Sequence, residues 1–302
     1  TTMASGFPSI FNDVIGPVMR GPSSSHCAAA LRIGRLARDL MGGRIARVLM
    51  EFDAKGSLAF THASQGSDMG LFGGLMGWDA QDERLLDSAA AARRAGIEVE
   101  ARISDFGDPH PNTYRLTLSN PYERHTMVAL STGGGMIEIV DIDRTPLSIR
   151  GDYWETLVAG DLQVGDIAGL AETAAEEISV RPGPKSALIQ IQSRSPLPAS
   201  VMAGLAARPG VLWTRSLAPV LPVLSRRQMR VPFLTSAEML AYSSGETLDL
   251  GRVALRYESA RGDIPEAEVF RRMGEIVRIL RASIAEGLRG TATADRILGF
   301  QS

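Results

Sequence analysis

Residues 16–26 (GPVMRGPSSSH) carry the densest group of reactive side chains in the sequence, at the point where a predicted helix begins. Glycine and proline shape a tight turn, and the free backbone N–H groups of a helix start attract a carboxylate or phosphate. Ser23, Ser24 and Ser25 could therefore hold the carboxylate or ammonium of a substrate, and His26 could move a proton or donate to an anion. A structural alternative stays open, in which Ser25 caps the helix and the other residues form a polar turn.

A second polar group lies in residues 56–79 (GSLAFTHASQGSDMGLFGGLMGWD), where a strand-like start meets His62, Gln65, Ser67 and Asp68. His62, at the end of this predicted strand, is a candidate proton carrier, but a single histidine in such a place is more often a satisfied polar residue. Asp68 is a candidate substrate ligand, but an aspartate before a helix is more often its cap. Spacing alone leaves both interpretations of each residue open.

Two further segments are less specific. His110 and Asn112 precede a predicted strand and, by themselves, are typical of a turn. Gly133-Gly134-Gly135 lies between two predicted strands and indicates a bulge or a close approach of the backbone. It is a poor candidate for a phosphate loop, because no helix is predicted to follow it.

The elements that must position these residues alternate in type through residues 1–150, which we predict to be one mixed domain. Helices are predicted at 26–41, before Gly42-Gly43, and at 82–95, before Gly96. The predicted strands are 45–53, 97–104, 113–119, 125–131 and 136–142.

Residues 151–222 are predicted to form a separate small α+β module of about 70 residues. The pattern gives the order strand, helix, strand, helix, strand. The predicted strands are 154–158, 187–192 and 212–216, and the predicted helices are 167–178 and 199–207.

Residues 223–302 are predicted to be a linker and a helical hairpin. Prolines and arginines in 219–234 argue against a helix there. Thr235 and Glu238 fit a capping box, and a second helix is expected to start near Pro265. Its apolar stripe at helical spacing needs a partner surface, because an isolated hairpin is rarely stable. The stripe is Val269, Met273, Ile276, Val277, Leu280 and Ile284. Four acidic residues of this segment are predicted to be solvated or to cap helices: Glu238, Asp249, Glu258 and Asp263.

The composition narrows the class of protein. A chain of 302 residues with 44% apolar residues suits two or three folded domains. The 32 basic and 34 acidic residues balance to a formal net charge of -2, so no nucleic-acid or acidic-lipid partner is expected. No apolar stretch reaches the roughly 18 residues of a membrane helix, and the first ten residues lack a signal-peptide pattern. No membrane association is therefore expected.

The sequence holds one cysteine, Cys27. It cannot form a disulfide within the chain, and one thiol cannot hold a zinc ion or a cluster alone. We therefore expect no metal ligands in this chain, and a reducing, cytoplasmic compartment.

Several motifs together resemble the beta domain of iron–sulfur-dependent L-serine dehydratases (L-serine ammonia-lyases). They occur in order over residues 9–142 as GPVMRGPSSSHCAAALRIGRLAR, GSLAFTHASQGSD, GLMGWDAQDERL, HPNTYRLTL and GGGMIEIV. The resemblance implies an α+β fold with a mixed α/β serine dehydratase beta domain at 1–150. Residues 151–222 occupy the place of an ACT-like βαββαβ module, and residues 223–302 resemble a linker and the N-terminal helices of the alpha part.

The resemblance also implies roles for individual residues. It makes His26, Gln65 and His62 the candidate catalytic residues. In the family motif K-G-H-G-T-D, which aligns with residues 63–68, Gln65 replaces the histidine, and glutamine cannot act as a base near neutral pH. This replacement puts L-serine itself in doubt as the substrate. The implied substrate-binding residues are Ser23, Ser24, Ser25, Asp68, His110 and Asn112.

The family's activity implies partners outside this chain. A four-iron four-sulfur (4Fe-4S) cluster, held by three cysteines of the alpha part, acts as a Lewis acid during loss of water from L-serine. Hydrolysis of the aminoacrylate product then gives pyruvate and ammonia. Cys27 matches none of these cysteines, so the cluster ligands are expected in an alpha portion or alpha subunit. The expected partners are thus an amino-acid substrate, the alpha portion, and other chains of a homo- or hetero-oligomer.

Two functions remain open on the sequence. Residues 9–142 could form one wall of a dehydratase site acting on L-serine or a related β-hydroxy amino acid. Alternatively, residues 1–222 could sense an amino acid and control a partner without catalysis. A lyase for another β-substituted amino acid is a third possibility.

Overall fold

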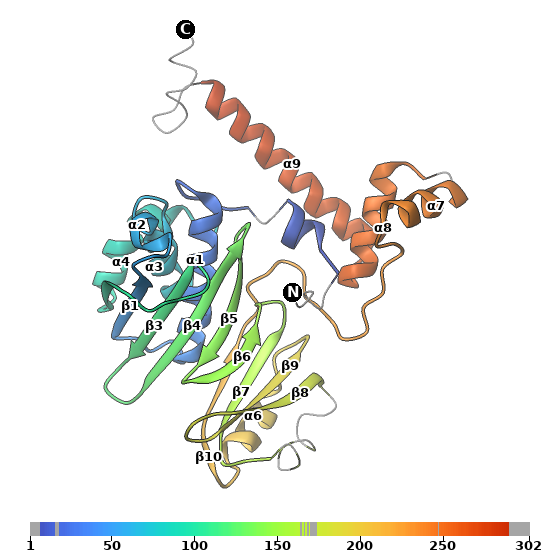
Figure 1. Cartoon of the computed structure of the whole chain (residues 1–302). Helices are drawn as coiled ribbons and strands as arrows, with labels where there is room; N and C mark the ends of the chain where they lie inside the picture. Colours follow the sequence, from blue (N-terminus) through green and yellow to red (C-terminus); the bar gives the residue numbers. More distant parts are fainter. Residues whose placement is uncertain are drawn as a thin grey trace. The chain divides into compact units, whose positions relative to one another are not determined.

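The computed structural model describes residues 7–15, 18–163, 165, 167, 169, 174–246 and 248–289. The chain divides into two compact units. The larger unit is Ile10–Gln228, and the smaller combines Thr1–Ser9 with Met229–Ser302. Both sheets lie in the larger unit (Figure 1).

A six-stranded sheet forms the first half of the larger unit, in the order β2-β1-β3-β4-β5-β6. The neighbouring strands β1 and β2 are parallel, and the other pairs are antiparallel. Burial alternates along β4, as expected for a sheet with one face covered. The strands are β1 (Arg47–Asp53), β2 (Glu98–Ser104), β3 (Thr113–Ser119), β4 (Arg124–Gly133), β5 (Met136–Ile142) and β6 (Thr145–Ile149).

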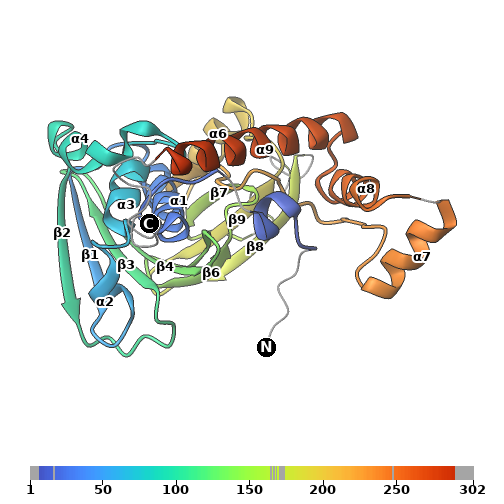
Figure 2. The ribbon, with the colours of Figure 1, turned by 90° about the horizontal axis from the view of Figure 1, so that it is seen from above.

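Helices cover one face of this sheet, as Figures 1 and 2 show for α1, α3 and α4. The predicted helix at 82–95 is split into a 3-10 turn and the short α4. The helical segments are η1 (Ile10–Val14), α1 (Ser24–Leu40), α2 (Leu58–Thr61), α3 (Ser67–Leu75), η2 (Glu83–Asp87) and α4 (Ser88–Arg94).

Glycines set the distance between α1 and α3. A Cβ atom added at Gly70 would lie 2.0 Å from the carbonyl oxygen of Cys27, and one at Gly74 would lie 2.1 Å from that of Leu31. A Cβ atom at Gly34 would lie 2.5 Å from a backbone oxygen of α3. The two helices therefore meet backbone to backbone, which fixes the N-terminus of α1 beside the N-terminus of α3.

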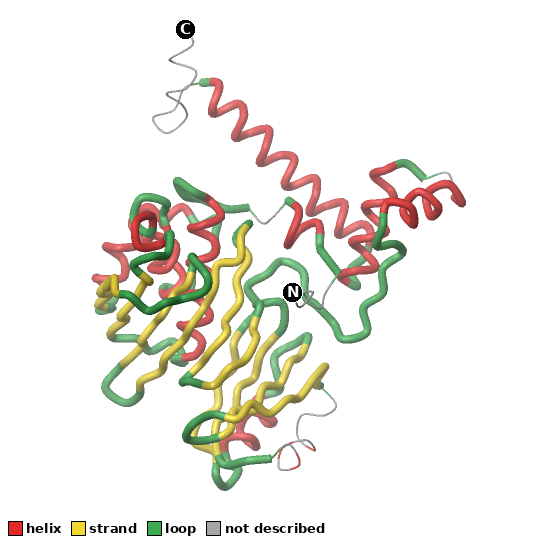
Figure 3. Tube along the Cα trace, viewed as in Figure 1, coloured by secondary structure: helices red, strands yellow, loops and turns green. Residues whose placement is uncertain are grey.

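A four-stranded antiparallel sheet forms the second half of the larger unit, in the order β10-β7-β9-β8. Its helix α6 is the helical segment beside these strands in Figure 3. Gly165, Ile167 and Gly169 are also helical, and their neighbours in the chain are not described. The elements are β7 (Trp154–Gly160), β8 (Ala175–Pro182), β9 (Ala187–Ser193), α6 (Ala199–Ala206) and β10 (Val211–Leu217).

The prediction for this module was incomplete. The helix expected at 167–178 is wrong at its end, because Ala175–Ile178 begin strand β8. Ile178 and Val180 lie on one face of that strand and pack against the module's core, so their spacing of two is a strand signal. The edge strand β6 was also missed, since Pro146 within it argues against a strand except at a sheet edge.

The smaller unit contains three helices among its described residues, where the sequence predicted a hairpin of two. Asp249 accepts a hydrogen bond from Arg252 N at 2.7 Å and thereby starts an additional helix. The predicted capping box is confirmed, since Glu238 N donates to Thr235 Oγ1 and Thr235 N donates to Glu238. The helices are α7 (Ser236–Glu246), α8 (Leu250–Gly262) and α9 (Glu266–Leu288).

The predicted surface roles in this unit hold for some residues and not for others. Asp263 adopts a left-handed conformation that ends α8, as a capping residue does. Glu258 is fully buried and accepts a hydrogen bond from Ser9 Oγ, so the prediction that it is solvated was wrong. In the apolar stripe of α9, Val269 is buried, whereas Ile284 is 64% exposed. None of the described helices is long and apolar enough to cross a membrane.

Candidate functional site

We call the segment 18–26, which leads into α1, the serine turn. Ser23, rather than Ser25, occupies the N-cap position of α1. The hydroxyl of Ser23 lies 2.8 Å from Nδ1 of His26 and caps no backbone group. Its own N–H donates to the carbonyl oxygen of Gln65 at 3.3 Å. The N–H groups of Ser24, Ser25 and His26 are the first-turn donors for which a helix provides no internal partner. This end of α1 is therefore suited to bind an anionic group.

Ser23 also sets the state of the imidazole of His26. When the hydroxyl donates to Nδ1, the neutral ring carries its proton on Nε2 and can donate there. Both side chains are partly exposed, so they can reach a bound molecule.

The turn also packs directly on the second polar group. Gly66 has a φ of 83°, and a Cβ atom added there would lie 2.9 Å from Pro22 Cδ. Together with the hydrogen bond from Ser23 to Gln65, this contact joins two segments that are about 40 residues apart in the chain.

His62 and Asp68 form a hydrogen-bonded pair. Nδ1 of His62 lies 2.7 Å from Oδ1 of Asp68, and their side chains are 17% and 23% exposed. The imidazole also packs on the ring of Phe52, with centroids 4.9 Å apart. A carboxylate on Nδ1 orients the ring and leaves Nε2 available to accept a proton.

Two expectations about this pair were wrong. His62 follows the short helix α2 rather than a strand, because the segment from Ser57 makes a helical turn. Asp68 does not cap α3, because the left-handed Gly66 occupies the N-cap and Asp68 lies within the first turn, facing His62.

Oε1 of Gln65 is buried and has no hydrogen-bond partner among the described residues. Oγ of Ser67 and the hydroxyl of Tyr114 are also buried nearby, and these two groups interact with each other. A buried polar atom without a partner is uncommon and needs an explanation, such as a ligand or a water molecule. Burial holds the pKa of Tyr114 far above its ordinary value, which outweighs the lowering by its hydrogen bond with Ser67, and the nearby Asp68 carboxylate adds to the rise. The phenol therefore stays protonated and can donate a hydrogen bond.

His110 and Asn112 form a structural turn beside the start of α2. Asn112 N donates to His110 Nδ1 at 3.2 Å, and Ser57 Oγ donates to Asn112 Oδ1. Ser57 N also donates to the carbonyl oxygen of Pro111 at 2.9 Å. These contacts connect the turn to the segment that carries His62. Within the described part of the chain, no hydrogen bond links His26 to His62 or Asp68. None of the described hydrogen bonds joins His110 or Asn112 to His26, His62 or Asp68.

Arg32 was not predicted to have any role in the site. It is 2% exposed, and its guanidinium donates to the carbonyl oxygen of Gly135. A Cβ atom at Gly135 would lie 3.1 Å from Met19 Sδ, so the glycine turn approaches the serine turn closely. The run was predicted to be a bulge or a close approach. The β4–β5 register shifts between Ser131 and Gly133, and only Gly135 of the three glycines has neighbours within 4 Å of an added Cβ atom.

The described residues do not fit an iron–sulfur cluster. Cys27 is fully buried in an apolar cluster with Leu31 and Leu85, and burial raises the pKa of its thiol to about 11. Metals bind the thiolate, so this cysteine is a core residue. Among the described positions, no three His, Cys, Asp or Glu side chains gather as a metal site would require.

Comparison with known proteins identifies two close relatives. The chain is 40% identical over 170 residues to the "Probable L-serine dehydratase, beta chain" of Bacillus subtilis (strain 168), covering 56% of this chain and 76% of that protein. It is 35% identical over 158 residues to the "L-serine dehydratase, beta chain" of Peptoniphilus asaccharolyticus, covering 52% and 70%. No family model matches the sequence.

Proposed function

Because the chain belongs to the family of L-serine dehydratase beta chains, we propose that it forms one wall of a dehydratase site for a β-hydroxy amino acid. The observation that carries this proposal is the junction of the serine turn with the His62 segment. A helix start suited to an anion, an oriented imidazole and the buried Oε1 of Gln65, which lacks a partner among the described residues, lie on adjoining segments.

The start of α1 supplies the binding part of the proposal. A substrate carboxylate at this end accepts hydrogen bonds from the free N–H groups of Ser24 and Ser25, and the helix dipole favours its charge. His26, held by Ser23, donates from Nε2 to the same group.

The pair of His62 and Asp68 supplies the base. Asp68 accepts the Nδ1 proton, so Nε2 of His62 takes the proton from the carbon that bears the amine. The bond from the next carbon to the hydroxyl then breaks with its electron pair on oxygen, and the proton that His62 took is delivered to that oxygen, so one water leaves and His62 is regenerated as the base. Gln65 has no titratable proton and is therefore assigned to substrate recognition rather than to proton transfer.

A partner chain completes the site in this proposal. Both relatives are named as beta chains, which supports a second, alpha chain. The cysteine ligands of a cluster are assigned to that partner, since Cys27 is buried in the core. The cluster supplies Lewis-acid chemistry when it is bound there.

The experiment that tests the base is a pair of matched substitutions in the complete assembly. Asp68→Asn keeps the size of the side chain but removes the charge that orients His62. We expect kcat/KM to fall by at least about tenfold, with an altered pH profile, and His62→Gln to cost about a hundredfold or more. Asp87→Asn changes an exposed aspartate that pairs with Arg94, and should leave turnover unchanged. Normal turnover by both site variants would refute the proposal.

An amino-acid-sensing role is the second candidate. The strand order β10-β7-β9-β8, with a helix after β7 and another before β10, is the arrangement expected for an ACT-like module. The replacement at Gln65 also favours it. Saturable binding of L-serine to the complete assembly, without turnover of any β-hydroxy amino acid, would favour sensing over catalysis.

A further inference from the structure

A cavity of about 450 Å³ lies between the two sheets of the larger unit, away from the serine turn. Its walls come from the β5–β6 turn, the β8–β9 turn and strands of both sheets. This volume suits a small metabolite. The residues used below are Arg124, Thr126, Asp143, Arg144, Lys185 and Trp213.

Three of the lining residues are cations, Arg124, Arg144 and Lys185, and one is a carboxylate, Asp143. Within the part of the chain that the structure describes, no carboxylate lies within ion-pair distance of the side chains of Arg124, Arg144 or Lys185. All three side chains are exposed, as are Arg93 and Arg208 elsewhere in the unit, so what distinguishes the three cations is that they line one cavity. Like charges gathered around one cavity repel one another, and a bound anion removes that repulsion.

The lining has one carboxylate, Asp143, and it is already engaged. Oδ2 of Asp143 lies 2.7 Å from Nδ1 of His125, and Oδ1 accepts a hydrogen bond from Thr126 N at 2.7 Å. The Asp143 carboxylate offsets one of the three cations, so the lining still carries more positive than negative charge, and its oxygens are already engaged by His125 and Thr126. This favours an anion over a zwitterionic amino acid.

The turn that presents one of these cations has an uncommon backbone. Asp143 has a φ of 53° and Arg144 a φ of 64°, in the left-handed region where glycine or asparagine is usual. An arginine is strained there, so its presence needs a reason other than the turn itself. Its place at the cavity wall supplies one.

We propose that this cavity binds a small metabolite with at least two negative charges, either a phosphate monoester or a dicarboxylate. Arg124 and Arg144 approach from the first sheet and Lys185 from the second. A doubly charged ligand can contact both sides at once. The site is separate from the proposed substrate site and does not depend on the dehydratase activity.

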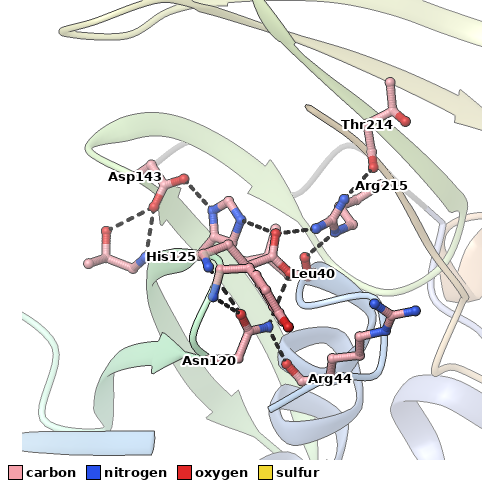
Figure 4. Close-up of polar contacts among 10 residues, drawn as sticks. Leu40, Arg44, Asn120, His125, Asp143, Thr214 and Arg215 are labelled. Carbon is pink, nitrogen blue, oxygen red and sulfur yellow. Dashed lines mark hydrogen bonds and ion pairs between the residues drawn. The ribbon is translucent and has the colours of Figure 1, made fainter. Parts of the chain in front are cut away.

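The cavity wall is also connected to α1. Trp213 packs edge-on against His125 with ring centroids 5.0 Å apart, and Figure 4 shows His125 beside Asp143. Nε2 of His125 lies 3.6 Å from Oε2 of Glu123. Glu123 pairs in turn with Arg215. Trp213 is thus linked through His125, Glu123 and Arg215 to Leu40 at the end of α1. We expect Trp213 to report ligand binding by a change in fluorescence.

The test is a titration of the full chain with probes of different charge. Inorganic phosphate and L-malate represent the two ligand sources, and acetate and L-serine serve as the monovalent and zwitterionic comparisons. We expect saturable binding of phosphate, L-malate or both by calorimetry, with a fluorescence change that Trp213→Phe abolishes. Tighter binding of phosphate than of L-malate identifies a phosphate monoester as the ligand class, and the reverse identifies a dicarboxylate. Acetate and L-serine should bind at least about tenfold more weakly.

Substitutions of single charged residues distinguish binding in this cavity from nonspecific attraction of anions to the protein surface. Arg144→Gln and Lys185→Gln should each weaken binding by about tenfold, the scale for losing one charge-assisted contact. Arg144→Lys should retain most of the affinity. Arg208→Gln, an exposed change in the same module outside this cavity, is the matched control and should change nothing. The proposal is overturned if neither dianion binds at up to about 1 mM, a common upper limit for metabolite affinity. Equal weakening by the control variant overturns it too.

Discussion

Nε of Arg215, on the last strand of the four-stranded sheet, donates a hydrogen bond of 2.7 Å to the carbonyl oxygen of Leu40, the last residue of α1. The same guanidinium pairs with Glu123, the residue before β4. Ala218 N adds a hydrogen bond of 2.9 Å to Asp39. The second sheet is therefore anchored to the C-terminal end of the helix whose N-terminal end carries the serine turn.

Removing this anchor should destabilise the larger unit. Arg215→Met keeps the apolar stem but leaves the partly buried Glu123 without its cation and Leu40 without this donor. We expect the free energy of unfolding to fall by about 2 kcal/mol, the scale for hydrogen bonds to a charged group. Urea unfolding followed by circular dichroism measures it.

The matched control for this anchor is Arg94→Met, which removes an ion pair with side chains 66% and 61% exposed. Its effect should stay within about 0.5 kcal/mol. If the two variants lose the same stability, the anchor adds nothing beyond an ordinary surface pair.

Periodicity predicted most of the elements of the larger unit. Helix α1 and the strands β1 to β5 carry long, regular apolar patterns, and each was expected within a few residues of its observed bounds. Strand β8 was missed because an alanine-rich segment before Ala175 continues a helical pattern into it. The edge strand β6 was missed because of Pro146.

The candidate site was predictable as a set of residues but not as a geometry. The motifs singled out His26 and His62, but their partners, Ser23 and Asp68, depend on turns that spacing does not specify. Tyr114 was overlooked because a tyrosine on a strand is usually a core residue. A tyrosine two residues after Asn112, within a motif already noted, was the available signal.

The contact between α1 and α3 gives a second prediction. Gly70→Ala and Gly74→Ala each place a methyl group about 2 Å from a backbone oxygen, where no flexible side chain can move away. The helices must separate, at a cost of about 3 kcal/mol or more, the upper end for overpacking a core. Thermal unfolding of the full chain should show a large drop in the Tm of the larger unit.

Gly274→Ala is the control for these two substitutions. Gly274 lies within α9, and nothing is within 4 Å of its added Cβ atom. Alanine should favour the helix by up to about 1 kcal/mol there. A Gly70→Ala protein as stable as the original would show that the two helices can repack without loss.

Glu155 gives a third prediction, concerning pH. It is 1% exposed, and Gln190 and Gln192 donate to its carboxyl oxygens at 3.0 and 2.9 Å. Burial raises the pKa of this carboxyl to about 8. Because the folded pKa lies above the ordinary value of 4.5, the folded protein binds the extra proton between these limits. Stability is therefore greatest below about pH 4.5 as far as this group is concerned, and falls as the pH rises towards 8.

Glu155→Gln removes this titration. We expect the original chain to lose about 4 kcal/mol of unfolding free energy through this group between pH 5 and pH 9, and the variant to show a much flatter profile. Glu83→Gln, which removes an exposed carboxylate in the other half of the larger unit, is the matched control for the loss of one acidic group. Parallel profiles for the original and the Glu155→Gln chain would show that Glu155 is ionised in the folded protein.

Gln65 gives the last prediction, concerning substrate choice. Its main-chain oxygen holds the serine turn through Ser23, while Oε1 of its side chain is buried without a partner among the described residues. The family motif has a titratable histidine at this position. We therefore expect the original enzyme to prefer a β-hydroxy amino acid with a further polar substituent, which Gln65 binds. Gln65→His should raise kcat/KM for L-serine by about tenfold relative to that substrate.

The measurement is a panel of L-serine, L-threonine and 3-hydroxyaspartate, run on the complete assembly with each residue at position 65. Ser64→His places the same imidazole one residue earlier, on an exposed side chain, and should leave the preference unchanged. Turnover that is best on L-serine in the original enzyme, with a pH profile that Gln65→His does not alter, would contradict the assignment. In that case Gln65 supports the serine turn through its backbone alone, and proton transfer depends on His62 whichever side chain stands at position 65.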